Sequence, residues 1–262
     1  MEQVEVVIDA GHGAHDPGAL GNGLQEKERA LTLSKMLNDE LRANGVSTYM
    51  TRSTDVFISL SGRAKLANER GAKVFISDHL NSGGGTGYES FTYTSIDDKT
   101  RRLQTLLHDA AMEVLSPLGF RDRGKKQANL AVLRETNMPA VLTENGFIDN
   151  ATDMAHIRKD DVLRKLAKAY AKAICTYLGK SYNGSAGGST GGSTSPAPVT
   201  GIAYILGTNV NLRKSPSTNG AFIRKLNKPE AYQVWARQGD WLNLGGDQWV
   251  FYDPSYIRFV QN

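Results

Sequence analysis

The sequence lacks the features that would place the chain in a membrane or in a disulfide-bonded class. It contains one cysteine, Cys175, so no disulfide can form within the chain. Cys175 lies in a periodic apolar run, Val162 to Leu178, with no neighbouring base, which predicts a buried filler rather than a nucleophile. No apolar run approaches the roughly 20 residues that a membrane-spanning helix needs. We therefore expect no membrane insertion.

The start of the chain also lacks the pattern of a secretion signal. Met1 to Glu5 is acidic and leads into a short apolar strand, without a basic segment and a long apolar core. We expect the protein to be made in the cytoplasm. The net charge of +4 favours anionic partners only weakly. Because the basic residues are dispersed and no nucleic-acid-reading motif occurs, we expect no nucleic-acid partner.

One segment divides the chain. Residues 181–200 consist almost entirely of Gly, Ser, Thr, Ala and Pro, a composition that cannot bury a core and predicts a flexible linker. The sequence thus predicts a first domain over residues 1–180 and a second over residues 201–262.

The first domain alternates between apolar runs suited to strands and stretches of helical period. This order predicts an α/β fold with a mostly parallel sheet covered on both faces. The expected strands are Val4–Asp9, Val46–Met50, Val74–Ser77, Tyr88–Tyr93, Ala131–Leu133 and Ala140–Thr143. The expected helices are Lys27–Asn44, Leu60–Arg70, Asp98–Leu118 and Asp160–Leu178, with a further short helix capped near Asn150 and Asp153.

The second domain shows short strands broken by Gly, Pro and Asn, which predict a small all-β barrel. The expected strands are Ala203–Leu206, Asn211–Arg213, Phe222–Leu226, Tyr232–Ala236, Trp241–Leu244 and Gln248–Phe251.

Polar side chains follow three of the strands expected in the first domain. His12 follows the first strand on a glycine-containing turn, His79 follows the third, and Glu144 follows the last. Glu26 begins the first long helix and can reach the same crevice. Because the carboxyl ends of parallel strands meet at one edge of a sheet, we expect these four side chains to lie together.

Two imidazoles and a carboxylate are a common catalytic ligand set for zinc, with a fourth position left for water. A second, unliganded carboxylate is then needed to move protons during amide hydrolysis, and Glu144 fits that role. Each residue also has a structural interpretation. A histidine at a strand end is often only hydrogen-bonded, Glu26 suits a solvated helix start, and Glu144 suits a cap or a salt bridge.

Other polar residues are less informative. His15 lies in a loop, and His108 and His156 lie in or beside helices, where a structural role is favoured. A basic segment around Arg123 can hold an anionic substrate or form a solvated turn. We take Asn81 and Arg123 as candidate substrate-binding residues.

Four ordered motifs from Val4 to Leu178 resemble the zinc N-acetylmuramoyl-L-alanine amidases of bacterial autolysins and phage endolysins. The motifs are VVIDAGHGAHDPGA, QEKE, SDHLNS and MPAVLTENGFIDN. The resemblance implies a mainly parallel six-stranded sheet between helices. It also implies that His12, Glu26 and His79 bind zinc and that Glu144 is catalytic.

The sequence departs from the family pattern at three positions near these motifs: Ala10, Ala14 and Asp78. All the implied ligands are intact. Asp78 replaces a residue that is usually apolar, so its side chain either changes the charge near the metal or points away from it.

The second domain, from Ile202 to Phe259, resembles bacterial SH3-like domains of wall hydrolases, most clearly in NLRKSPS. Its aromatic residues suit either a groove for wall peptide or glycan or the core of a barrel. They are Trp235, Trp241, Trp249, Tyr252 and Tyr256. We take Trp241 and Tyr256 as candidate substrate-binding residues.

The sequence therefore predicts a peptidoglycan amidase that cleaves the bond between N-acetylmuramic acid and L-alanine, with peptidoglycan and its anionic polymers as partners. We expect it to reach the wall through holin-type lesions or on lysis of a mother cell. Two alternatives remain open: a metal-dependent peptidase or deacetylase of wall material, and a wall-binding protein without catalysis.

Overall fold

The structure is a computed structural model that describes residues 3–183, 197–216, 220–238, 241–252 and 256–261. Its contacts divide the chain into two units, Met1–Gly187 and Gly188–Asn262. Of the predicted linker, residues 184–196 lie outside the described residues. The predicted bounds of the linker, residues 181 and 200, are wrong at both ends. Tyr182 donates its hydroxyl hydrogen to Glu40 of the first unit, and a strand of the second unit begins at Ala197.

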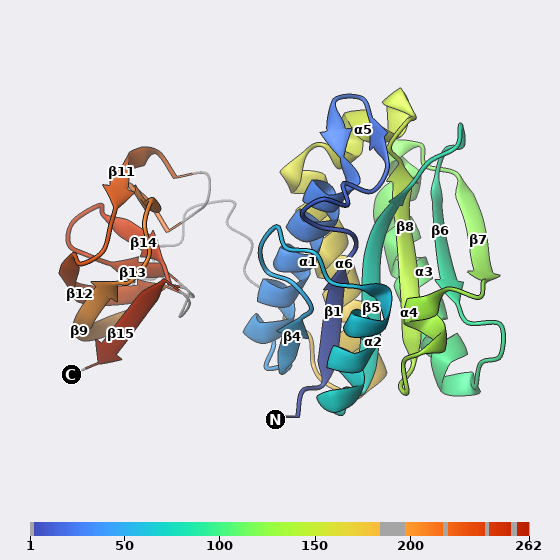
Figure 1. The fold of residues 1–262 in the computed structure, drawn as a ribbon, viewed down its shortest axis with the longest axis horizontal. Coiled ribbons are helices and arrows are strands. Elements are labelled where there is room, and N and C mark those ends of the chain that lie inside the picture. The colour runs from blue at the N-terminus through green and yellow to red at the C-terminus, as the bar shows by residue number, and fades with distance from the viewer. Residues whose placement is uncertain (1–2, 184–196, 217–219, 239–240, 253–255, 262) are drawn as a thin grey trace. The chain divides into compact units, whose positions relative to one another are not determined.

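The first unit is built on a six-stranded sheet with the strand order β4-β1-β5-β8-β6-β7 (Figure 1). Every neighbouring pair is parallel except β8 with β6, so β6 and β7 run opposite to the other strands. The prediction of a mainly parallel sheet is confirmed. The strands are β1 (Val6–Ala10), β4 (Thr48–Met50), β5 (Val74–Asn81), β6 (Tyr88–Thr92), β7 (Asp122–Gln127) and β8 (Ala140–Phe147).

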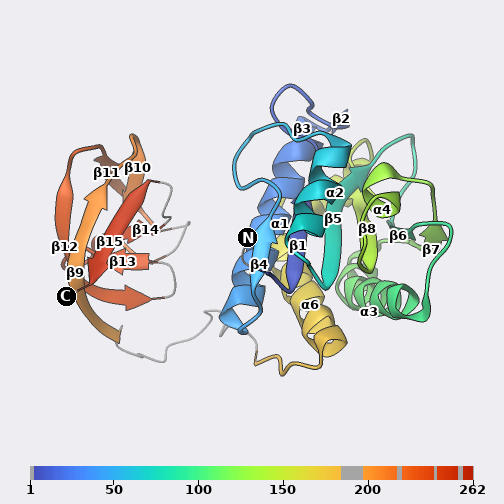
Figure 2. The same cartoon turned by 60° about the horizontal axis from the view of Figure 1, so that its bottom comes forward.

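Helices cover both faces of this sheet, with α1, α3 and α6 against one face and α2 and α4 against the other (Figures 1 and 2). They are α1 (Glu26–Ala43), α2 (Leu60–Glu69), α3 (Asp98–Leu115), α4 (Ala131–Arg134), α5 (Ala151–Ile157) and α6 (Asp160–Leu178). In β1, Val6 and Ile8 enter the core under α1, while Val7 enters the core under α2. This two-sided burial explains why the strand is a continuous apolar run.

Most predicted helices are confirmed, with small shifts at their ends. Asn150 caps α5 as expected, because its Oδ1 accepts hydrogen bonds from the backbone N–H groups of Thr152 and Asp153. The helix expected over Asp98–Leu118 ends instead at Leu115 and continues as a single 3₁₀ turn, Ser116–Leu118, that contains a proline. None of the helices in the described part of the chain is both long and apolar enough to cross a membrane.

Two predictions for the sheet are wrong. Ala131–Leu133, expected as a strand, forms most of helix α4, and its Val132 and Leu133 bury against the core under α2. A run this short carries no period that separates strand from helix. The sixth strand is instead β7, in the basic segment interpreted as a loop or turn. It is an edge strand, where charged residues are common because one side stays open.

The second unit is an all-β region with a seven-stranded sheet in the order β11-β10-β14-β13-β12-β9-β15. Its strands are β9 (Ala197–Ile205), β10 (Val210–Arg213), β11 (Phe222–Leu226), β12 (Ala231–Gln238), β13 (Trp241–Asn243), β14 (Trp249–Phe251) and β15 (Ile257–Gln261). Strand β15 was not among the strands expected from the sequence. The described strand pairs are antiparallel and enclose a separate core that includes Leu212, Val234 and Val250.

A buried ion pair joins β1 to α2 in the first unit. Asp9 is fully buried, and it accepts hydrogen bonds from Arg63 Nη1 at 2.8 Å and from the hydroxyl groups of Thr51 and Ser77. Arg63 also donates to the carbonyl groups of Ala10 at 2.6 Å and His12 at 2.7 Å. This arginine therefore fixes the path of the chain as it leaves β1.

We expect Arg63→Met to lower the free energy of unfolding of the first unit by about 3–5 kcal/mol, because Asp9 would keep a buried charge without its cation. Urea unfolding followed by circular dichroism at the helix band measures this, since the described helices all belong to the first unit. The control is Lys65→Met on the same helix, whose side chain is 74% exposed. Equal losses in the two variants would contradict the prediction.

Candidate metal centre and active site

Residues of neighbouring strands form one row at the edge where β1, β5 and β8 end. His79 of β5 pairs with Glu144 of β8, and Glu144 pairs in turn with Glu89 of β6. Gly11, directly after β1, extends the row, because its N–H donates to the carbonyl of Asp78 at 3.1 Å. Paired residues project from the same face of a sheet. The row therefore delivers an imidazole and two carboxylates to one surface.

Two glycines leave room for the side chains of this site. A β-carbon on Gly11 would lie 2.3 Å from Cε1 of His79, well inside contact distance. A β-carbon on Gly18 would lie 2.6 Å from Glu26 Oε2 and 2.7 Å from His12 Cδ2. Gly18 also has a φ of 66°, which favours glycine. The backbone approaches all three polar side chains closely because these positions have no side chain.

His12 leaves β1 on a tight turn in which Gly13 and Asp16 exchange backbone hydrogen bonds. The backbone of His12 has a φ of 61°, in the left-handed region, which is uncommon for a residue with a side chain. Its Nδ1 lies 2.9 Å from Asp16 Oδ2, and its Nε2 lies 3.0 Å from Glu26 Oε1. The contact with Asp16 therefore fixes the ring with Nε2 turned toward Glu26.

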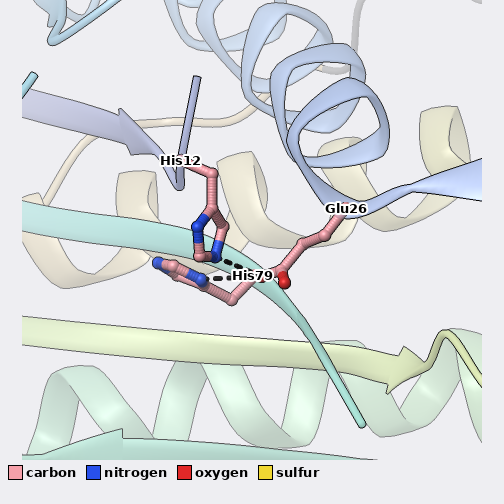
Figure 3. A group of neighbouring side chains, drawn as sticks. All are labelled: His12, Glu26 and His79. Atoms are coloured by element: carbon pink, nitrogen blue, oxygen red, sulfur yellow. Dashed lines mark hydrogen bonds and ion pairs between the residues drawn. The ribbon is translucent and has the colours of Figure 1, made fainter. Parts of the chain in front are cut away.

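Glu26, the first residue of α1, contacts both imidazoles with its carboxylate (Figure 3). Its Oε1 is 3.0 Å from His12 Nε2 and 2.8 Å from His79 Nδ1, and it accepts a hydrogen bond from the N–H of Leu80. Its Oε2 accepts a hydrogen bond from the N–H of Ala19 at 2.8 Å. The carboxylate is only 3% exposed, so these four contacts define its position.

The three side chains form a group that could hold a metal ion. One donor atom from each of His12, Glu26 and His79 lies within 4.8 Å of the others. These residues come from three separate segments: the turn after β1, the start of α1 and the end of β5. The structure thus brings together the three residues that the sequence singled out as metal ligands.

Burial opposes the charged form of each group in this cluster, but the contacts among them outweigh it. Hydrogen bonds with both imidazoles, together with their charges, lower the pKa of the Glu26 carboxyl group far below its usual range. The same contacts with Glu26 raise the pKa of His12 and raise that of His79 to about 9. Glu26 therefore keeps its negative charge in a buried place, as a ligand for a cation must.

Glu144 lies next to this cluster but makes no comparable contacts. Its Oε2 is buried and has no hydrogen-bond partner among the described residues. Burial raises the pKa of its carboxyl group to about 7, with Glu26 and Glu89 adding to the rise and His79 opposing it. A carboxyl group near neutrality can both take and give a proton, which suits acid–base catalysis.

The side chain of Asp78 points away from the cluster. It is fully buried and accepts hydrogen bonds from the hydroxyl groups of Ser34 at 2.7 Å and Thr143 at 3.1 Å. Burial raises the pKa of this carboxyl group to about 6. Of the two interpretations left open by the sequence, the structure therefore supports a side chain that packs beneath the site.

Two further candidates lie near Glu144 and meet at a residue that sequence reasoning missed. Asn81 Nδ2 donates to Glu89 Oε1 at 2.6 Å, and Arg123 Nε donates to Glu89 Oε2 at 2.7 Å. Nothing in the motif spacing marks Glu89, because its place beside Glu144 comes from the antiparallel pairing of β6 with β8. Asp16 was also missed, although it follows His12 by four residues.

Two other histidines, His108 and His15, make contacts of their own away from the cluster. His108 is buried and lies between the Ser90 hydroxyl at 2.9 Å and the Asp122 carboxylate at 3.0 Å. The ring of His15 contacts that of Phe57 in a tilted arrangement, with 4.3 Å between centroids. Neither belongs to the cluster around Glu26.

The aromatic residues of the second unit divide by exposure. Trp249 is only 7% exposed and belongs to the interior, whereas Trp235 is 59% exposed. Trp241 is half-buried, edge-on to the ring of Phe251, and Tyr256 is half-buried against the core. The two candidates named from the sequence are thus only partly buried.

Comparison with known proteins identifies relatives of the first unit. A family model described as N-acetylmuramoyl-L-alanine amidase matches residues 6–176. A sporulation-specific N-acetylmuramoyl-L-alanine amidase of Bacillus subtilis is 45% identical over 175 residues, which cover 65% of this chain and 67% of that one. An endolysin of Bacillus phage SPP1 is 43% identical over 187 residues, covering 69% of each chain.

Solved structures show the same fold. The catalytic domain of the amidase CwlV from Bacillus (Paenibacillus) polymyxa var. colistinus is 34% identical, with a TM-score of 0.63. The match covers 69% of this chain and 100% of that domain. The mixed α/β arrangement with a mainly parallel sheet is therefore that of these amidases, and the second unit lies outside the family match.

We expect Glu144→Gln to stabilise the metal-free protein at pH 8 but not below pH 4.5. The folded-state pKa is raised from 4.5 to about 7, so the unfolded state ionises first as the pH rises and the folded state loses relative stability between these values. Because glutamine does not ionise, the variant should gain roughly 1–3 kcal/mol in its free energy of unfolding at pH 8. Urea unfolding with a chelator present measures it. The control is exposed Glu113→Gln, and a gain that does not depend on pH would contradict the prediction.

Proposed function

This chain belongs to the N-acetylmuramoyl-L-alanine amidase family, and from that premise we propose that His12, Glu26 and His79 bind one zinc ion beside Glu144 as the catalytic acid and base. The protein is an amidase that hydrolyses the amide bond between N-acetylmuramic acid and L-alanine in peptidoglycan. The observation that carries the proposal is the convergence of three donor atoms next to a buried carboxylate oxygen that has no partner among the described residues.

The donor set fits zinc. Catalytic zinc sites commonly have three protein ligands drawn from nitrogen and carboxylate donors, with a fourth position open. The contact of His12 Nδ1 with Asp16 is the kind of outer contact that orients a metal-binding imidazole. When bound, zinc polarises a carbonyl and makes a water molecule acidic enough to attack an amide.

The residues of the chain then have two roles, proton transfer and the positioning of the proposed ligands. Glu144 Oε2 takes a proton from the attacking water and returns it to the nitrogen of L-alanine as the carbon–nitrogen bond breaks. In the metal-free protein, burial raises the pKa of this carboxyl group, which makes it a better acceptor for the proton of water. Gly11 and the buried contacts of Glu26 hold the imidazole and the carboxylate in place, so little reorganisation is needed during the reaction.

We expect Glu144→Gln to keep its zinc and lose about 10²–10⁴-fold in rate, because proton transfer is removed and no ligand is lost. His79→Ala should lose both zinc and activity. Zinc content and the products of wall digestion measure this. Cleavage by the unchanged protein should release new amino termini of L-alanine without new reducing sugars.

Two substitutions serve as controls for these variants. Exposed Glu113→Gln and His15→Ala change the same residue types outside the cluster, so both should keep zinc and activity. Full activity in either Glu144→Gln or His79→Ala would contradict the mechanism. Reducing sugars or cut peptide cross-links as the main products would contradict the bond assignment.

We further propose that the second unit is a bacterial SH3-like domain that binds the wall through Trp241 and Tyr256. The proposal is supported by its all-β fold, the NLRKSPS segment and the partial exposure of both residues. A catalytic and a binding unit on one polymer raise each other's effective concentration, so two weak contacts give tighter attachment. The pI near 9.0 adds attraction to anionic wall polymers, which salt should weaken.

We expect Trp241→Ala to weaken wall binding by about 3- to 30-fold, because an aromatic contact surface is lost. Both the parent and the variant carry Glu144→Gln, so that the wall is not digested during sedimentation with purified wall fragments. The control is Phe222→Ala, which removes a 55% exposed ring from β11. Equal binding by parent and variant would contradict the assignment of Trp241.

The relatives include a phage endolysin and a sporulation-specific amidase. By analogy we infer that the protein reaches the wall from the producing cell, either through membrane lesions or when a mother cell lyses. Peptidoglycan is its substrate in both cases.

A further inference from the structure

The guanidinium group of Arg123 is fixed on two sides near the active site. Its Nε donates to Glu89 Oε2 at 2.7 Å, and its central carbon lies 4.7 Å from the centroid of the Phe147 ring. The two terminal nitrogens have no hydrogen-bond partner among the residues that the structure describes. The side chain is 27% exposed. A guanidinium held in this way leaves its two terminal nitrogens available to a ligand.

Glu89 is the residue that holds this arrangement together. It is 3% exposed and accepts hydrogen bonds from Arg123, from Lys126 Nζ at 2.5 Å and from Asn81 Nδ2. A buried carboxylate needs such partners to offset its lost hydration. Two cations on one anion leave the group with a net positive charge, so it attracts an anion from solution.

The location of Arg123 matches the length of the substrate. Glu89 is the direct cross-strand partner of Glu144, and Arg123 lies on β7, the next strand. Neighbouring strands are about 4.8 Å apart, so Arg123 starts roughly 10 Å from Glu144 and its side chain shortens that gap. In an extended peptide the second residue lies about 7 Å from the first bond, because each residue spans about 3.3–3.6 Å.

The chemistry of the substrate indicates which side of the scissile bond carries an acid. The carboxyl group of N-acetylmuramic acid is itself consumed in the amide that the enzyme cuts, so the sugar side offers no free carboxylate. The stem peptide continues beyond L-alanine with a glutamate whose remaining carboxyl group is free in some walls and amidated in others. A planar carboxylate matches the two terminal nitrogens of a guanidinium.

We propose that Arg123 binds the free carboxylate of the second stem-peptide residue, with Glu89 as a positioning residue, so that the enzyme selects walls by the amidation state of that residue. The inference rests on the proposed function, because it takes the bond after N-acetylmuramic acid as the one that is cut. It adds a specificity determinant on β6 and β7, outside the cluster around Glu26.

The test compares two soluble disaccharide-peptides that differ only in whether this carboxylate is free or amidated. Neither contains phosphate, so wall polymers play no part. The unchanged full-length protein should cleave the free-acid substrate with a kcat/KM about 10- to 100-fold higher, as expected for one charge-assisted contact. Arg123→Gln should remove this preference, because it should raise KM for the free acid far more than KM for the amide and should change kcat less than KM.

Three further variants separate recognition from structural damage. Arg123→Lys keeps the charge but lacks the two terminal nitrogens that match a planar carboxylate, so it should retain only part of the preference. Glu89→Gln should lower the preference without abolishing cleavage of the amidated substrate. The matched control is Arg121→Gln, an exposed arginine two residues away whose loss removes the same charge and should leave the preference intact.

The outcomes are distinct. Equal cleavage of both substrates by the unchanged protein overturns the inference and leaves the proposed function standing. A loss in Arg123→Gln that is equal for both substrates also overturns it, because a structural role then suffices. If Arg121→Gln loses the preference to the same extent, general charge attraction explains the preference, and the inference about Arg123 is overturned as well. Cleavage of neither substrate at the amide next to N-acetylmuramic acid overturns the proposed function, and the inference with it.

Discussion

The site depends on one buried negative charge, the carboxylate of Glu26, which the fold holds between two imidazoles. A carboxylate that is 3% exposed is unfavourable unless its oxygens are satisfied. Here both oxygens accept backbone N–H groups, from Ala19 and Leu80, before either imidazole is considered. The backbone therefore stabilises the negative charge of Glu26 and fixes the position of its carboxylate, and the two imidazoles bind to a group that is already in place. A cation that enters the cluster meets donors that are already in position.

The sheet beneath the site supplies the rigidity. Asp9 and Asp78 lie under the ends of β1 and β5, and each is fully buried with polar partners of its own. Arg63 connects the first of these carboxylates to the carbonyl of His12, while Asn145 donates to the carbonyl of His79. Both imidazoles thus have backbones tied to a buried polar layer. Such layers are costly when incomplete, which favours a single arrangement of the chain around the site.

Much of the first unit could be predicted from the sequence because its strands are buried on both faces and its polar residues follow strand ends. That reasoning places His12, His79 and Glu144 at one edge, and the structure brings them there. It fails where local pattern carries no tertiary information. Strand β7 is polar because it is an edge, and Glu89 gains its importance only from pairing with Glu144 across an antiparallel boundary. Neither the direction of β6 nor its register with β8 can be deduced from the spacing of residues in the sequence.

The contact of Gly11 with the ring of His79 limits how this site can be transplanted or varied. Since a single added carbon at that position would overlap the imidazole of His79, the residue that follows the first strand is restricted to glycine by a side chain of the neighbouring strand and not by the turn alone. Anyone grafting His12, Glu26 and His79 onto another parallel sheet would have to copy this empty position as well. The site is thus defined as much by a missing methyl group as by the donor atoms of the cluster.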